Sequence, residues 1–162
     1  MKTFAFATAL AALLATSTVA QAEVIRHTTP GSNFPILRAV EIPADATLVY
    51  LSGVVPGIAN ETVDRNSPEA FGDTKTQTVS VLERIQANLD AIGLTMGDVV
   101  KMQVYLVAGD SGAMDFSGFM EGYTQFFGNE TQPNFPTRSV FEVAGLANAN
   151  WLVEIEVVAV RE

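Results

Sequence analysis

The chain has 162 residues, no cysteine, a single histidine and a formal net charge of −9 at neutral pH. Without cysteine it cannot form disulfides, thiol nucleophiles or thiolate metal sites, and His27 alone excludes a His-x-x-x-His metal pattern or a two-histidine ribonuclease mechanism within one chain. Nucleic acid is also an unfavourable partner, because phosphate binding needs clustered Lys and Arg.

Residues 1–22 have the pattern of a secretory signal peptide. Lys2 precedes a small apolar run that closes on Ala20-Gln21-Ala22, an A-x-A cleavage site. This run falls short of the roughly 18 to 20 apolar residues that a spanning helix needs, and no later stretch approaches that length. We therefore expect export to the periplasm or beyond, no membrane partner, and one domain over residues 23–162.

Segments rich in Val, Ile and Tyr predict strands, and two segments with apolar residues at helical spacing predict helices. In chain order these are strands 24–29, 37–42 and 47–53, a helix over 74–94, a strand over 98–107, a helix over 115–128, and strands 137–146 and 151–162. The stretches 56–73 and 109–114 are predicted to be surface loops. Two helices on one face of a mixed sheet would satisfy this order, which indicates an α+β fold.

The first helix has clear start and stop signals. Thr74-Lys75-Thr76-Gln77 matches a capping box, and Gly93 suits a C-cap. The second helix carries a broad aromatic stripe, and its two internal glycines weaken its propensity, so packing must hold it. Such a stripe is more often core than binding site.

Ser52-Gly53 ends the third predicted strand. A glycine there lets the backbone approach a ligand, and the serine hydroxyl can donate a hydrogen bond. A simple turn is the commoner explanation of the same pair.

Arg138 stands inside the predicted strand 137–146. Strand alternation places it on one face with Val140 and Glu142, where its stem can pack on apolar surface and its planar fork can bind a carboxylate through two hydrogen bonds. The alternative is a salt bridge at the surface or at a subunit interface.

Glu154 and Glu156 share one face of the strongly apolar last strand. Carboxylates rarely enter such strands unless they are paired, hydrogen-bonded or exposed. One of them, held near a bound anion, could position a water molecule for attack, and an exposed strand face is the alternative.

Taken in order, five segments resemble the RidA/YjgF family of enamine and imine deaminases. They are LVYLSGVVP, NLDAIGLTMGDVVKMQVYL, YTQFF, NFPTRSVFEVAGL and VEIEVVAV, from about Phe34 to the end. The most specific part is P-x-R-S followed a dozen residues later by V-E-I-E.

The resemblance implies a chorismate-mutase-like α+β fold, assembled as a homotrimer with sites between subunits. It implies hydrolysis of a 2-imino acid to a 2-oxo acid and ammonia without metal or organic cofactor. Arg138 would hold the substrate carboxylate, Glu154 would orient the attacking water, and Ser52 with Gly53 would line the pocket. Some members have been described as ribonucleases, but the acidic charge and the single histidine argue against that role here.

Several positions depart from the usual family pattern, and all make the pocket more apolar. Ile36 stands where tyrosine is frequent, Met120 where asparagine is common, Val140 where cysteine is frequent, and Val54 where a glutamine follows S-G. We expect the carboxylate anchor and water site to be retained and the recognition of the substrate side chain, which involves Ile36, Met120 and Val140, to be altered.

Two functions follow as expectations. The first is an exported deaminase acting on small imino or enamine acids. The second is a non-catalytic trimer of the same fold that binds small carboxylates or a protein partner.

Overall fold

The computed structural model describes residues 23–161 except residue 110, and the predicted signal peptide lies outside this range. The elements in chain order are β1 (Ile25–His27), β2 (Ala39–Glu41), β3 (Thr47–Tyr50), η1 (Pro68–Ala70), α1 (Thr74–Asp90), η2 (Met96–Asp98), β4 (Val99–Val107), α2 (Phe116–Tyr123), β5 (Thr137–Val143) and β6 (Val153–Arg161). Both predicted helices and all the predicted strands are present. The first three strands, β1, β2 and β3, are shorter than the segments predicted for them. Within the described residues, no helix is long and apolar enough to cross a membrane.

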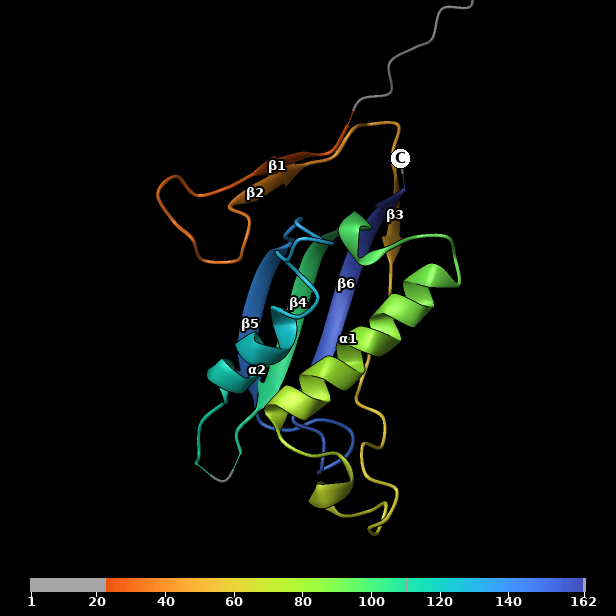
Figure 1. Cartoon of the computed structure of the whole chain (residues 1–162), viewed down its shortest axis with the longest axis vertical. Coiled ribbons are helices and arrows are strands. Elements are labelled where there is room, and N and C mark those ends of the chain that lie inside the picture. The colour runs from red at the N-terminus through yellow and green to blue at the C-terminus, as the bar shows by residue number, and fades with distance from the viewer. Residues whose placement is uncertain (1–22, 110, 162) are drawn as a thin grey trace, which may run out of the picture.

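Four strands form the main sheet in the order β3-β6-β4-β5 (Figure 1). The β4 and β5 strands pair in parallel, whereas β6 is antiparallel to both β3 and β4. The parallel pair needs a crossover, and the segment containing α2 supplies it. The sheet is therefore mixed, and both helices lie on the same face of it, which confirms the predicted α+β fold.

The core lies between the helices and one face of this sheet. Residues at alternate positions of β4 and β6 are fully buried there, together with the apolar stripe of α1 and the aromatic stripe of α2. The members with no exposed surface include Val81, Leu82, Ile85, Leu89, Met102, Val104, Leu106, Phe119, Tyr123, Val153 and Ile155. The prediction that the aromatic stripe belongs to the core is confirmed.

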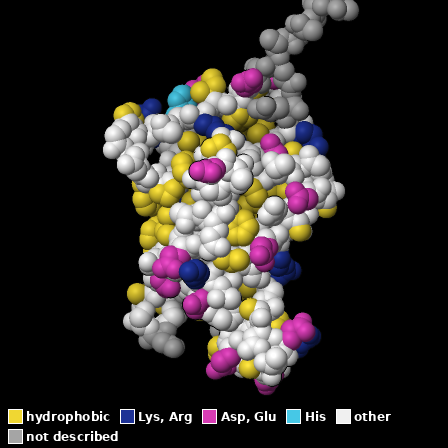
Figure 2. Space-filling view, in the orientation of Figure 1, with side chains coloured by type: hydrophobic (Ala, Val, Ile, Leu, Met, Phe, Trp, Pro, Cys, Tyr) yellow, Lys and Arg dark blue, Asp and Glu magenta, His cyan; other side chains and the backbone are white. Residues whose placement is uncertain are grey.

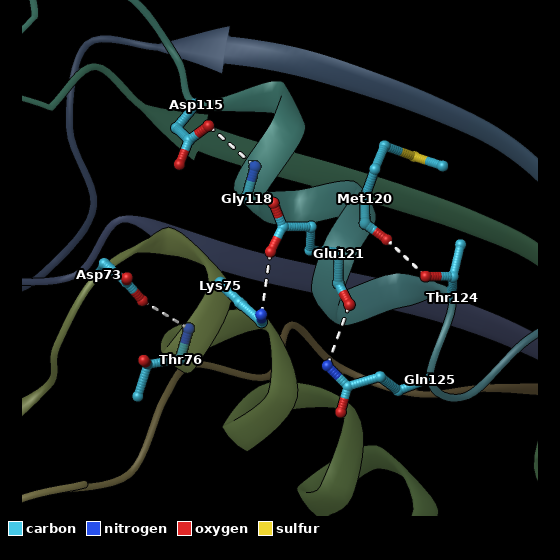
Figure 3. Close-up of polar contacts among 9 residues, drawn as sticks. All are labelled: Asp73, Lys75, Thr76, Asp115, Gly118, Met120, Glu121, Thr124 and Gln125. Atoms are coloured by element: carbon cyan, nitrogen blue, oxygen red, sulfur yellow. Dashed lines mark hydrogen bonds and ion pairs between the residues drawn. The ribbon is translucent and has the colours of Figure 1, made fainter.

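The capping prediction for α1 is wrong by one residue. Asp73 is the N-cap, and its Oδ1 accepts a hydrogen bond from the Thr76 amide at 2.8 Å, as Figure 3 shows. Gln77 is fully buried, and its side-chain oxygen accepts from the Leu152 amide at 2.7 Å rather than completing a capping box. Its side chain also donates to the carbonyls of Gly72 and Asn150, because a buried amide must find partners and the local backbone is already capped.

The second helix ends earlier than its aromatic stripe suggests. It stops at Tyr123, and turns continue to Gly128, which adopts a positive φ of 73°. The side chain of Asp115 caps its start, and Lys75 of α1 forms an ion pair with Glu121 of α2 at 2.9 Å (Figure 3). Packing of Phe119, Tyr123 and Phe127 on the sheet holds these turns in place of helical propensity.

The first two strands form a separate antiparallel pair at one end of the molecule (Figure 1). The segment that joins them returns to the body near the start of β5, where the Leu37 amide donates to the Pro136 carbonyl at 3.2 Å. The Tyr123 hydroxyl also donates to the Pro35 carbonyl at 3.2 Å. Two contacts therefore fix residues 34–37 beside Arg138.

Candidate active site

Arg138 lies on β5, an edge strand of the sheet, opposite Met102 of β4. Because Met102 is fully buried beneath the helices, the same face of β5 directs Arg138 and Val140 toward α2. The sharing of one face by Arg138, Val140 and Glu142 follows as predicted. Glu142 does not pair with Arg138, because its carboxylate accepts a hydrogen bond from the Met114 amide at 2.7 Å.

Three aromatic rings surround the Arg138 guanidinium. Its Cζ lies 4.2 Å from the ring centre of Tyr123, 5.1 Å from that of Phe119 and 5.7 Å from that of Phe34. These are cation–π distances, which hold the positive charge without neutralising it. Tyr123 and Phe119 come from α2, and Phe34 comes from the segment between β1 and β2.

The electrostatics of this cluster follow from burial. Burial lowers the pKa of the Arg138 guanidinium, which nonetheless stays charged at neutral pH. Burial also raises the pKa of Tyr123 to about 12, although the nearby Arg138 charge acts in the opposite direction. Among the described residues, Arg138 forms no ion pair, and its Nη1 atom is buried without a hydrogen-bond partner. A buried guanidinium in this condition is suited to an anion supplied from outside.

Glu154 lies on β6, on the face of the sheet that the helices leave uncovered. It pairs with Tyr105 of β4, and both side chains alternate with buried neighbours. A methyl group added to Gly53 would collide with the Glu154 carboxylate, so the glycine permits this close approach. Ser52 is exposed beside it, and Val54 is buried and pairs with Ile155. The structure thus places Ser52, Gly53 and Glu154 together.

The two glutamates of β6 have different surroundings. Glu156 accepts a hydrogen bond from the Tyr105 hydroxyl at 3.2 Å, and that hydroxyl accepts one from Gln103 at 3.0 Å. Burial and the nearby Glu156 charge together raise the pKa of Tyr105. Within the part of the chain that is described, no hydrogen bond engages the Glu154 carboxylate, which leaves this side chain free to accept one from water.

Arg138 and Glu154 are not brought together within one chain. They lie on opposite faces of the sheet, on β5 and β6, and β4 separates these two strands. Ile36, Met120 and Val140 are half-buried on the Arg138 side, and Ser52 and Gly53 are on the Glu154 side. Figure 3 shows the Met120 side chain extending away from α1. The predicted site residues therefore form two groups, one on the Arg138 side and one on the Glu154 side, and the sheet separates them.

Phe34, Phe119 and Tyr123 are the neighbours of Arg138 that sequence reasoning did not assign to the site. The two α2 aromatics were expected as core, and they are core, but their rings also contact the guanidinium. Phe34 precedes Pro35 in a segment without periodicity, so no pattern signalled its position. Among the described residues, no group of three or more His, Asp or Glu side chains is arranged to hold a metal ion.

Comparison with known proteins decides the family. A family model described as Endoribonuclease L-PSP matches residues 34–161. The chain belongs to this family, which is RidA/YjgF.

Relatives within the RidA/YjgF family are named for deaminase activity. The putative reactive intermediate deaminase TdcF of Escherichia coli K12 is 34% identical over 82% of this chain and 91% of its own. The 2-iminobutanoate/2-iminopropanoate deaminase of Salmonella typhimurium is 32% identical over the same shares. A crystal structure of E. coli TdcF with bound serine is 30% identical, covers 88% of this chain and all of its own, and gives a TM-score of 0.56. These likenesses support deaminase chemistry at the level of the RidA/YjgF family.

Proposed function

We propose that this chain is an exported deaminase that hydrolyses 2-imino acids, or the enamines in equilibrium with them, to 2-oxo acids and ammonia. The observation that carries the proposal is Arg138, a buried guanidinium held by three rings and given no carboxylate by the described residues. The names of the relatives support the reaction type, and the sequence of residues 1–22 supports export.

The catalytic site lies between two copies of the chain. One copy contributes Arg138 with Ile36, Met120 and Val140, and a neighbour contributes Glu154 with Ser52 and Gly53. This arrangement accounts for two half-sites that face opposite sides of one sheet. It also gives the uncovered sheet face a role, because half-buried side chains such as Tyr105 and Val158 would become covered in the homotrimer.

The chemistry requires little more than orientation. Arg138 binds the substrate carboxylate through two hydrogen bonds and so fixes the neighbouring C2 atom. Glu154 accepts a proton from a water molecule whose oxygen bonds to C2, while the C=N electron pair moves to nitrogen and is protonated. In the resulting tetrahedral adduct the hydroxyl loses its proton and the amino nitrogen gains one, with the Glu154 carboxyl group relaying the proton. The C–N bond then breaks, ammonia leaves, and the C2–O bond becomes the carbonyl of the 2-oxo acid.

Ammonia release from imino acids generated in place by an amino-acid oxidase tests this proposal. The wild-type chain should exceed the spontaneous rate. The Arg138→Ala variant should lose about 30-fold in substrate affinity, since a charged hydrogen-bonding group is removed. The Glu154→Gln variant should keep its affinity and lose about 100-fold in turnover, since general-base catalysis is removed.

Glu156→Gln is the matched control, because it changes the adjacent carboxylate on the same strand face. It should retain most of the turnover if Glu154 alone positions water. Binding of 2-oxo acids without acceleration of any imino acid would contradict the deaminase proposal and favour the non-catalytic binding role. Full turnover in a correctly folded Glu154→Gln variant would remove Glu154 from the mechanism.

A further inference from the structure

Phe34 has a position that no predicted role for this chain explains. It lies between β1 and β2, and 49% of its surface is exposed, although its ring lies 5.7 Å from the Arg138 guanidinium. Large apolar side chains are usually withdrawn from water when a core is available. The exposed ring of Phe34 therefore sits at the edge of the carboxylate anchor and partly in solvent.

The other two rings of the cluster cannot contact a ligand in the same way. Phe119 and Tyr123 have no exposed surface and pack against each other at 5.7 Å between ring centres. Of the three rings around Arg138, only Phe34 is exposed to solvent.

Hydrogen bonds hold the backbone around Phe34 in place. The Phe34 amide donates to the Ser32 hydroxyl oxygen at 3.2 Å, and the Phe34 carbonyl accepts from the Ile36 amide at 2.8 Å. The hydrogen bonds of Pro35 and Leu37 to the body of the protein follow directly. A backbone held in this way keeps Phe34 beside Arg138, so a ligand does not have to order this segment on binding.

Apolar side chains also lie on the Arg138 side of the sheet. Ile36, Met120 and Val140 are each half-buried on this side of the molecule. Figure 2 shows hydrophobic side chains gathered along the edge formed by β5, below the β1–β2 pair. A carboxylate bound to Arg138 carries its side chain on the adjacent carbon, so that side chain must lie against this surface.

We propose that Phe34 is a specificity-determining residue that selects 2-imino and 2-oxo acids with large apolar side chains, aromatic ones above all. The inference rests on the proposed role of Arg138 as carboxylate anchor. An aromatic side chain packs against the exposed part of the Phe34 ring and removes apolar surface from water on both partners. A small or polar side chain gains neither contact. The ligand of the E. coli TdcF structure is serine, whose side chain is small and polar.

Equilibrium binding of two stable 2-oxo acids tests the proposal without requiring turnover. Calorimetric titration with phenylpyruvate and with pyruvate should show at least about tenfold tighter binding of phenylpyruvate to the wild-type chain. Phe34→Ala should reduce this ratio about fivefold by weakening phenylpyruvate, with little change for pyruvate. Phe34→Leu keeps an apolar side chain and should give an intermediate ratio, which covers the case of a poorly folded alanine variant.

Two controls separate this inference from the proposed function. Residues 23–41, which carry β1 and β2, form an N-terminal arm. Ile25→Ala removes another exposed apolar side chain of this arm, 52% exposed on β1, and should leave the ratio of the two affinities unchanged. Arg138→Ala should weaken both ligands together.

Equal affinity of the wild-type chain for both acids, or an unchanged ratio in both Phe34 variants, would overturn the specificity role while the deaminase proposal stands. Selective phenylpyruvate binding without any imino-acid turnover would leave the specificity role in place and remove the deaminase. Failure of both acids to bind would overturn the anchor and the specificity role together.

Discussion

Two arginines of this chain show how surroundings decide the role of one residue type. Arg26 donates to the carbonyls of Val99, Phe135 and Gly97 at 2.8 to 3.1 Å. It ties the N-terminal arm to the start of β4 and is fully engaged. Arg138 carries the same group into a cluster of three aromatic rings, where its Nη1 atom is buried without a hydrogen-bond partner. An engaged arginine stabilises the fold, and an arginine with a vacant buried donor is suited to a ligand.

Substitution of Gly53 by alanine should affect catalysis more than stability. Gly53→Ala places a Cβ against the Glu154 carboxylate, which is the far end of a flexible side chain and can rotate away. We expect the free energy of unfolding to change by less than about 1 kcal/mol. Turnover should fall about tenfold, because the displaced carboxylate no longer aims the water.

Urea unfolding and ammonia release on the same Gly53→Ala preparation check this expectation. Gly57→Ala is the matched control, since a Cβ there meets only the Ser80 hydroxyl at 3.6 Å, an ordinary contact. Equal losses of stability and turnover in Gly53→Ala would indicate a purely structural glycine.

At the scale of elements, α2 links the arm to the sheet through Tyr123. Its hydroxyl bonds to Pro35, its ring covers Arg138, and burial raises its pKa to about 12. The unfolded chain has an ordinary tyrosine pKa near 10, so the folded state holds the proton longer. The contribution of Tyr123 to stability is therefore complete below about pH 10 and is lost as the pH rises toward 12.

The Tyr123→Phe variant should lack this alkaline loss. At neutral pH it should be less stable than the wild-type chain by about 1 kcal/mol, since the Pro35 carbonyl loses its partner. Between pH 10 and 12 the wild-type chain should lose about 2 kcal/mol more than the variant, which narrows or reverses the difference. Urea unfolding at pH 8, 10 and 11.5 measures both effects. If the free energy of unfolding changes equally with pH in both proteins, the raised pKa of Tyr123 is contradicted.

At the scale of the whole molecule, the two half-sites make a prediction about mixtures. Arg138→Ala and Glu154→Gln should each be strongly impaired alone when the substrate concentration is below the wild-type KM. Copies mixed by unfolding and joint refolding should regain activity, because about one quarter of the interfaces then combine an intact Arg138 with an intact Glu154. Light scattering should give the mass of three copies. A monomeric mass, or a mixture no more active than its components, would exclude a site shared between copies.

The sequence by itself determined the class of fold, the family and the elements that carry the site. Strand alternation correctly placed Arg138 with Val140 and Glu142, and Glu154 with Glu156, because the period of a strand is a local property. The five ordered segments sufficed to predict the RidA/YjgF family, which the family model confirms. The buried role of the α2 aromatics also followed from their spacing.

Only the tertiary structure decided what each candidate residue meets. Local alternation cannot say that β4 lies between β5 and β6, or that the helices cover the Arg138 face and leave the Glu154 face bare. It could not place Phe34, which reaches Arg138 because residues 34–37 are bonded to α2 and to the start of β5. Gln77 was likewise misassigned to a capping box, since its side chain also bonds Asn150 and Leu152, which are distant in sequence. Contacts between residues far apart along the chain depend on how layers pack, and no local period records that packing.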